Sequence, residues 1–236
     1  MSDKEEILEN NEEIENTVEV LSDAEAQRKR IVQFALAGVA LVAVLIGGFL
    51  FYRYTKQNTE KEAALKLSRI RSFYDAGQFE VALGGVSGTI RGESVVGLTA
   101  ISSQYSSAES GRLAALYAGN ALSTLGRYSE AERYFDQASA ASSDITKMGA
   151  LAGLGSCRSN GNQNAEAAKY YEQAAAIGAK LGDEDRYKLF AAMHYEKAGQ
   201  KEKALSLYRA ITASPEFSEA ITEAKAGIIR LGATLE

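Results

Sequence analysis

The chain has 236 residues, enough for one ordinary domain plus appendages. It has one proline, no tryptophan and many Ala, Leu, Glu and Lys residues, so it favours an all-α fold with turns made by glycine. The net charge of −5 is uneven, because residues 1–30 hold ten acids and four bases whereas residues 53–236 are nearly neutral. A nearly neutral domain excludes a large basic face, so we expect no nucleic acid partner.

The segment 31–52, IVQFALAGVALVAVLIGGFLFY, carries no charged side chain. At 1.5 Å per residue it matches the bilayer core of about 30 Å, so it predicts one transmembrane helix. A cleaved signal peptide fits poorly, because the stretch is long and follows an acidic tail of about 30 residues. Arg28, Lys29 and Arg30 favour a cytoplasmic N-terminus, which puts residues 53–236 on the periplasmic side in a bacterium.

The acidic tail, residues 1–30, has two interpretations. Ile7, Ile14, Val18 and Leu21 recur at helical spacing, so a short amphipathic helix is able to dock on a basic partner. The run of charges and the low hydrophobicity favour disorder instead.

From residue 60 onward the sequence resembles itself at spacings of 36 and 37 residues. In each copy a small residue is followed twelve positions later by a second small residue, and four positions after that by an aromatic one. The repeat-packing residues are therefore Gly119, Ala131 and Phe135, then Gly155, Ala167 and Tyr171, and then Ala192, Ala204 and Tyr208. Small residues let two antiparallel helices approach, and the aromatic fills the groove that faces the next hairpin.

Three clear helical hairpins follow from this pattern, each with a glycine-containing turn between its two helices. They cover about 111–142, 147–179 and 184–213, with turns at 126–128, 161–162 and 199–200. Residues 217–233 suit a capping helix that closes the stack.

A weaker copy of the hairpin lies upstream, at about 60–88. Gly77 marks its turn and Ala82 is its small residue, while Ile70 and Val86 replace the glycine and the aromatic. A glycine-rich insert follows at 84–110, and its LTAISSQYSS stretch predicts a short helix.

Three phrases carry a resemblance to a known family. They are LYAGNALSTLGRYSEAERYFDQASA (116–140), GLGSCRSNGNQNAEAAKYYEQAAA (153–176) and FAAMHYEKAGQKEKALSLYRAI (190–211), and they resemble the tetratricopeptide repeat family. The resemblance covers about 60–235 and implies an α-solenoid of about four helical hairpins with a C-terminal capping helix.

A more specific resemblance rests on the order of the segments. An acidic tail, one span, a degenerate repeat and then GRLAALYAG (111–119) resemble single-span proteins of the bacterial inner membrane, among them the ancillary subunit of the Sec translocon. This resemblance implies protein partners: a membrane complex such as the translocon, a periplasmic chaperone, or exported client proteins.

Residues that carry chemistry are scarce. His194 is the only histidine and Cys157 the only cysteine, and they fall in different repeats. Catalytic triads and most transition-metal sites need imidazole beside another ligand or nucleophile. We therefore expect no enzyme activity, no catalytic residue, no metal site and no cofactor.

The tetratricopeptide resemblance also implies where partners bind, because the first helix of each hairpin lines the concave surface in that family. The implied groove residues are Leu113, Leu116, Asn120, Ser123, Ala152, Ser156, Arg186, Leu189, Met193 and Glu196. The family's clamp for a C-terminal carboxylate is matched at Asn120 and Arg186 but not at Leu116, Gly153 and Phe190, which favours an extended or helical polypeptide. The alternative is that these side chains only pack between hairpins.

The sequence therefore predicts a membrane-anchored interaction scaffold on the periplasmic face of the inner membrane, which assists the translocation or folding of exported proteins. A structural assembly subunit of another membrane complex is the alternative.

Overall fold

The computed structural model describes residues 2–90, 92–214 and 219–235. Before residue 41, the exposure of the side chains is described only at positions 28, 34, 36 and 38. The chain divides into two units, Met1–Lys56 and Gln57–Glu236.

Helix α1 spans Ser2–Asp75 and so belongs to both units. The charge of the acidic tail favours disorder over a short helix. In the structure residues 2–30 are part of α1, in keeping with the many strong helix formers in this segment. Within the described part of the chain, no helix is long and apolar enough to cross a membrane. In the first part of the predicted span 31–52, up to residue 40, side-chain exposure is described only at positions 34, 36 and 38.

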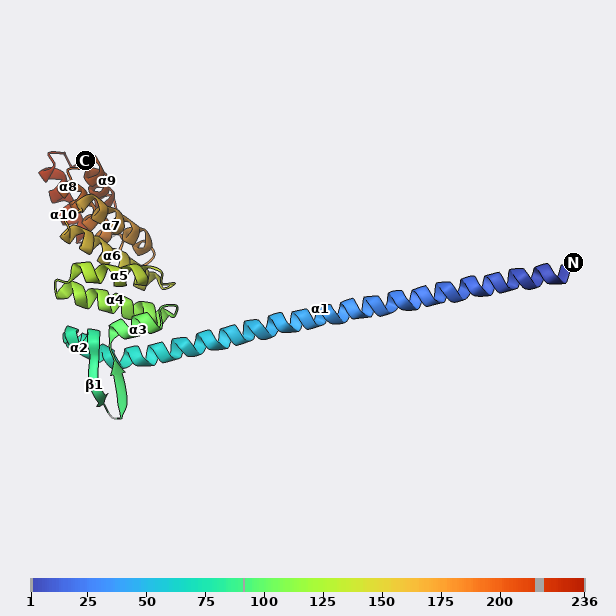
Figure 1. Ribbon diagram of the computed structural model, residues 1–236. Coiled ribbons are helices and arrows are strands. Elements are labelled where there is room, and N and C mark those ends of the chain that lie inside the picture. Colours follow the sequence, from blue (N-terminus) through green and yellow to red (C-terminus); the bar gives the residue numbers. More distant parts are fainter. Residues whose placement is uncertain (1, 91, 215–218, 236) are drawn as a thin grey trace. The chain divides into compact units, whose positions relative to one another are not determined.

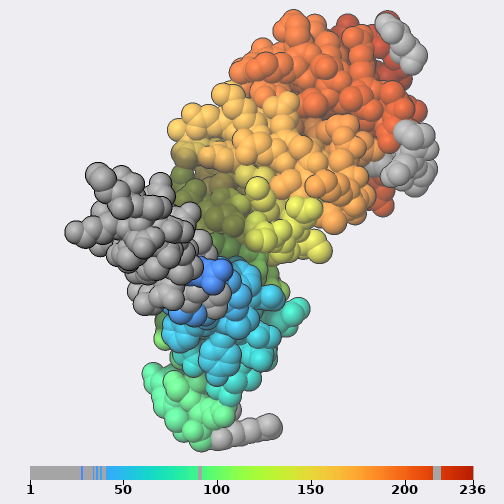
Figure 2. Space-filling view, turned by 90° about the vertical axis from the view of Figure 1, so that its right-hand side faces the viewer, coloured from blue at the N-terminus to red at the C-terminus, as the bar shows by residue number. Residues whose placement is uncertain are grey.

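The second unit is a stack of antiparallel helical hairpins that follow one another in chain order (Figure 1). The hairpins are α4 (Glu109–Thr124) with α5 (Tyr128–Ser139), α6 (Asp144–Asn160) with α7 (Asn164–Gly178), and α8 (Glu184–Lys197) with α9 (Lys201–Thr212). Helix α10 (Ala220–Arg230) packs on α8 and α9 and closes the C-terminal end. In Figure 2 the hairpins appear as successive bands that run from green to red.

The turns inside the hairpins share one backbone conformation. The left-handed residue is Gly77, Gly126 or Gly199 in three of them, with φ of 73°, 77° and 71°. In the α6–α7 turn Asn162 (φ 59°) takes this conformation rather than Gly161, which the sequence pattern favours. In each turn the N–H three residues past the helix end donates to a carbonyl five residues back, as in a Schellman cap, so Asn serves where Gly is usual.

A β-hairpin interrupts the second helix of the first hairpin. After α2 (Phe79–Gly84) come the antiparallel strands β1 (Gly85–Ile90) and β2 (Glu93–Val96), and then α3 (Leu98–Gln104). The left-handed residues Gly77 and Gly126 lie 49 positions apart, whereas the later ones are separated by 36 and 37. Subtracting the 13 residues of 85–97 from 49 leaves 36, so this segment is an insertion into an otherwise regular repeat.

The insertion is therefore 85–97, rather than the segment 84–110 that glycine content suggests. The second helix resumes after it as α3, which is the short helix expected in LTAISSQYSS. The Thr99 hydroxyl donates to the carbonyl oxygen of Leu83 across the insertion (2.9 Å). The sequence pattern places Val86 at the helix position that an aromatic residue occupies in the other copies. Val86 lies in β1 instead, because the strand begins at Gly85.

The small residues of the repeat pattern lie where the helices of each hairpin meet. Ala131, Ala167, Ala192 and Ala204 are fully buried. Phe135 is 1% exposed and lies against Gly119 of its own hairpin and Gly153 of the next; a Cβ on these glycines would approach ring carbons of Phe135 to 2.7 and 2.4 Å. An aromatic ring between two glycines thus joins consecutive hairpins.

A buried aromatic ring also faces a glycine of the next helix at the C-terminal end of the stack. The junction between the second and third of these hairpins differs. Tyr208 is fully buried, and a Cβ on Gly227 of α10 would approach its ring to 2.5 Å. Tyr171 faces Gly155, but the next hairpin offers Phe190 and His194 in place of a glycine, with ring centroids at 5.4 and 5.3 Å. Ring stacking here replaces the close helix approach that glycine permits.

Candidate protein-binding surface

The first helices of the hairpins carry a row of partly exposed residues at equivalent positions of the repeat. We call these residues the first-helix face. They are Leu113, Tyr117 and Asn120 on α4, Gly149, Gly153 and Ser156 on α6, and Arg186, Phe190 and Met193 on α8. Because the spacings are 36 and 37 residues, three columns of equivalent positions run along the stack.

Several predicted groove residues lie between helices rather than on an open surface. Leu116 is buried, and its Cδ2 lies 3.3 Å from where a Cβ on Gly149 would stand. Ser123 faces the thiol of Cys157 in the next hairpin, and Ala152 and Leu189 pack against buried apolar clusters, as Leu113 and Met193 also do. These contacts join the hairpins whether or not a partner binds.

Glu196, also predicted to line the groove, is engaged by the capping helix. Its carboxylate accepts from Nε of Arg230 (2.6 Å), from Nη2 of Arg230 (3.0 Å) and from the hydroxyl of Tyr208 (2.7 Å). The hydrogen bonds from Arg230 lower the pKa of Glu196 and outweigh the opposing effect of burial. Glu196 therefore fixes α10 to the last hairpin.

The remaining predicted groove residues, Leu113, Asn120, Ser156, Arg186 and Met193, all lie on the first-helix face. Their role in binding stays a prediction.

Two tyrosines that sequence analysis did not single out lie at the N-terminal end of this face. The rings of Tyr74 on α1 and Tyr117 on α4 are 4.8 Å apart, and the guanidinium of Arg71 lies 5.8 Å from the Tyr117 ring. Burial raises the pKa of Tyr74, and a hydrogen bond with Asn120 partly offsets it. The sequence signal for Tyr117 is its spacing from Leu113 and Asn120, which places the three residues on one face of a helix.

A second group of aromatic residues lies further along the stack. Tyr187 and Phe190 are 6.1 Å apart, and the exposed guanidinium of Arg186 lies 5.6 and 6.0 Å from their rings. His194 is buried, stacked on Tyr171, and its Nδ1 lies 3.1 Å from Oδ1 of Asn164. Burial lowers the pKa of His194, with a smaller contribution from Lys197.

The only cysteine has an environment that disfavours nucleophilic chemistry. Cys157 is buried, and burial raises the pKa of its thiol to about 11, with a further contribution from Glu132. The thiol is therefore protonated at neutral pH, whereas nucleophilic cysteines need the thiolate.

A shallow cavity of about 300 Å³ lies where α2, α3, α4 and α5 meet. Glu80, Arg127, Glu130 and Arg133 line it, and Arg127 pairs with Glu130 (2.7 Å) and more loosely with Glu80 (3.4 Å). The acids and bases of this lining balance, so the cavity has no strong preference for an ion of either sign.

No protein-family model matches the sequence, and no curated protein matches it either. Among solved structures, the chain is similar to a Podosopora anserina putative kinesin light chain with nearly identical TPR-like repeats, at 17% identity and a TM-score of 0.49. The match covers 70% of this chain and 83% of that chain. A second structure, of a substituted form of the same protein, gives 17% identity and a TM-score of 0.49, over 70% and 82% of the two chains.

The hairpins of the second unit share one repeating pattern. One turn conformation and one aromatic position recur at 36 and 37 residues, and small first-helix residues face the aromatic ring. The second unit is therefore an α-solenoid of helical hairpins with a repeat of 36 to 37 residues.

Proposed function

We propose that this chain is a membrane-anchored scaffold that binds other proteins through the first-helix face. The observation that carries the proposal is the partial exposure of Tyr74, Tyr117 and Phe190, each of which packs on a buried cluster with one side of its ring. Aromatic side chains supply large contact areas at low entropic cost and are enriched where proteins bind. Asn120, Ser156 and Arg186 add hydrogen-bonding groups along the same face, which suits an extended or helical polypeptide.

The proposed anchor is the segment 31–52 of α1. Its support is the density of exposed apolar side chains there: Leu41, Val42, Val44, Leu45, Ile46, Phe49, Leu50 and Phe51 are all between 53% and 72% exposed. Such exposure costs about 25 cal/mol per Å² in water, and soluble monomers rarely expose contiguous apolar patches of this size. A bilayer removes that cost. Tyr52 and Tyr54 at one end suit the interface.

The proposed location is the bacterial inner membrane, with the N-terminus in the cytoplasm and the repeat unit in the periplasm. It is supported by the bases at 28–30 and by the order of tail, apolar segment and repeats. The proposed partners are a membrane complex such as the secretion translocon, its periplasmic chaperones or exported chains. An anchored repeat unit acts by raising effective concentration at the membrane, so weak reversible contacts suffice.

The anchor is tested by membrane fractionation in bacterial cells. Full-length protein should float with membranes and resist extraction at high pH. A variant with 31–52 replaced by a Gly/Ser segment of equal length should be soluble while keeping the circular dichroism of a folded repeat unit. Retention of that variant on membranes under the same extraction would refute the assigned anchor.

A further inference from the structure

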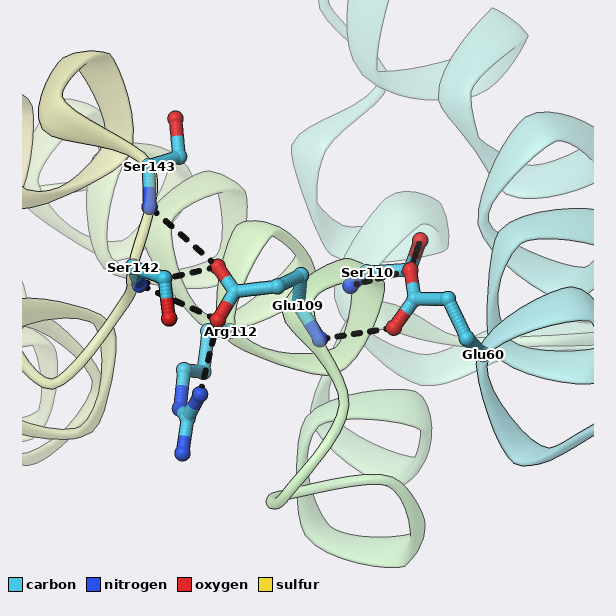
Figure 3. A network of polar contacts seen from close by, with 6 residues as sticks. All are labelled: Glu60, Glu109, Ser110, Arg112, Ser142 and Ser143. Atoms are coloured by element: carbon cyan, nitrogen blue, oxygen red, sulfur yellow. Dashed lines mark hydrogen bonds and ion pairs between the residues drawn. The ribbon is translucent and has the colours of Figure 1, made fainter. Parts of the chain in front are cut away.

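Figure 3 shows Glu60 beside Ser110 and the backbone of Glu109, and the Glu109 side chain beside Ser142 and Ser143. The carboxylate of Glu60 on α1 accepts hydrogen bonds from the backbone N–H groups of Glu109 (2.7 Å) and Ser110 (2.9 Å) at the start of α4. The carboxylate of Glu109 in turn accepts from the N–H groups of Ser142 (3.0 Å) and Ser143 (3.4 Å), before α6. Each carboxylate thus satisfies free N–H groups at the start of the next first helix.

The chain of contacts continues between α6 and α8. Nζ of Lys180, before α8, lies 3.7 Å from Oδ2 of Asp144 at the start of α6. Burial alone would raise the pKa of Glu109, but the hydrogen bonds from Ser142, Arg112 and Ser143 outweigh it and lower that pKa. We call the residues 104–110, 139–147 and 178–184 the entry edge, because the chain enters the second unit at Gln57, just before Glu60.

The entry edge exposes two large apolar side chains. Ile145 is 66% exposed and Leu181 is 40% exposed, and each has an exposed lysine nearby, Lys147 and Lys180. The other exposed residues there are mostly small and uncharged: Ser106, Ser107, Ala140, Ser142, Ser143 and Ala179. The acids at this edge have partners, with Asp144 near Lys180, Asp183 near Arg186 and Glu184 near Lys188.

The opposite edge, formed by the turns 125–130, 161–166 and 197–203 and called the far edge, is more highly charged. Its exposed residues include Arg127, Glu130, Lys197, Lys201 and Lys203. Apolar and small residues with two lysines suit the interface of a bilayer, where lysine stems lie along the apolar boundary and amines reach the phosphates. The more highly charged far edge is suited to contact with water.

We propose that the entry edge rests on the bilayer surface, with Ile145 and Leu181 inserted at the boundary between headgroups and acyl chains. This inference depends on the proposed anchor at 31–52. Only residues 53–59 separate the proposed anchor, which ends at Tyr52, from Glu60, and even fully extended they reach at most about 30 Å. Glu60, against which α4 begins, therefore stays within that distance of the end of the anchor.

Site-specific fluorescence on the full-length chain tests this contact. In a Cys157→Ser background, single cysteines replace Ile145 and Leu181 on the entry edge, and Leu125 and Ile229, which are 37% and 61% exposed, away from it. Each carries the same environment-sensitive dye in vesicles of phosphatidylcholine and phosphatidylglycerol with nitroxide-labelled lipid. Circular dichroism confirms that every labelled variant is folded.

The expected result is a several-fold larger loss of emission at positions 145 and 181 than at 125 and 229. A further label at Leu45, within the proposed anchor, separates the two proposals. Quenching at 45 with equal, weak quenching at the other four positions overturns the contact of the entry edge and leaves the anchor standing. Absence of quenching at 45 overturns the anchor and the contact together.

Discussion

The carboxylate of Glu196 and the guanidinium of Arg230 form a two-point ion pair between α8 and α10, with N–O distances of 2.6 and 3.0 Å. The Glu196 side chain is only 19% exposed, and the hydroxyl of Tyr208 donates to the same carboxylate. This pair joins the last hairpin to the helix that covers its apolar surface. A stack of repeats needs such a cover, because a terminal hairpin otherwise exposes the face that a further repeat would bury.

We predict that Arg230→Ala lowers the free energy of unfolding by about 1–2 kcal/mol, since it leaves a half-buried carboxylate without its charged partner. Arg230→Lys should cost less, because it keeps the charge but loses the planar two-point geometry. Urea unfolding and hydrogen exchange of α10 measure both effects. Equal stability of Arg230→Ala and the parent would show that the cap is held by apolar packing alone.

We predict that Gly153→Ala destabilises the stack by about 1–3 kcal/mol, because the added methyl group overlaps the buried ring of Phe135. Gly84→Ala is the matched control, since a Cβ at Gly84 meets nothing within 4 Å. The double variant Gly153→Ala, Phe135→Leu should recover part of the loss. Thermal unfolding provides the comparison, and equal effects of the two Gly→Ala changes would contradict the assigned ring contact.

Deletion of the inserted β-hairpin should leave a folded repeat unit. Removing 85–97 joins α2 to α3 with the regular spacing of 36 residues and keeps Ser102, which is fully buried, on the core side of the joined helix. Stability should fall, because Val95 loses its buried position. Circular dichroism and thermal unfolding are the measurements.

A deletion of 85–95 is the control for the insertion, because two extra residues rotate α3 by about 200° relative to α2. This variant should be less stable than the deletion of 85–97, although it removes fewer residues. The reverse order of stability would show that 85–97 is not an insertion into a continuous helix.

The stability of the repeat unit should depend on the protonation of His194. Burial lowers the pKa of this residue in the folded state, so the unfolded chain, with a histidine pKa of about 6.5, takes up the proton first. Stability is therefore fully present above the unfolded pKa and is lost as pH falls toward the folded pKa. The surroundings are Tyr171, Asn164 and Lys197, and none of them supplies a negative charge to the imidazolium.

Urea unfolding between about pH 7.5 and 5.5, a window above the carboxylate range of about 4 to 4.5, isolates this effect. His194→Gln should flatten the slope in that window, whatever its effect on absolute stability. An unchanged slope would assign the pH dependence to another group.

The repeat could be predicted from sequence because its signal is periodic and local. Small residues and aromatics at fixed offsets fix which faces of two helices meet, and glycine marks the turn between them. The turn at 161–162 was predicted, but its left-handed residue is Asn162 and not Gly161, because Asn is the other residue that tolerates a left-handed backbone.

The binding face was harder to predict because the rotation of a helix about its axis depends on packing. Leu116 lies one position before Tyr117, yet Leu116 is buried against Gly149 and Tyr117 is partly exposed. Glu196 was assigned to the groove from the resemblance, and the sequence does not show its ion pair with Arg230, which lies 34 residues away on α10. The β-hairpin was not predicted within the glycine-rich insert, since its two strands are short and alternate weakly.

The most direct test of the proposed scaffold is photo-crosslinking in bacterial cells from Asn120 and Met193 on the first-helix face, with Lys201 on the far edge as the control position. The account predicts adducts from 120 and 193 that contain translocon subunits, folding factors or varied exported chains, and few adducts from 201. One constant partner from an unrelated complex at stoichiometric yield would identify a structural subunit instead. Equal adducts from all three positions would contradict the assignment of the first-helix face as the binding surface.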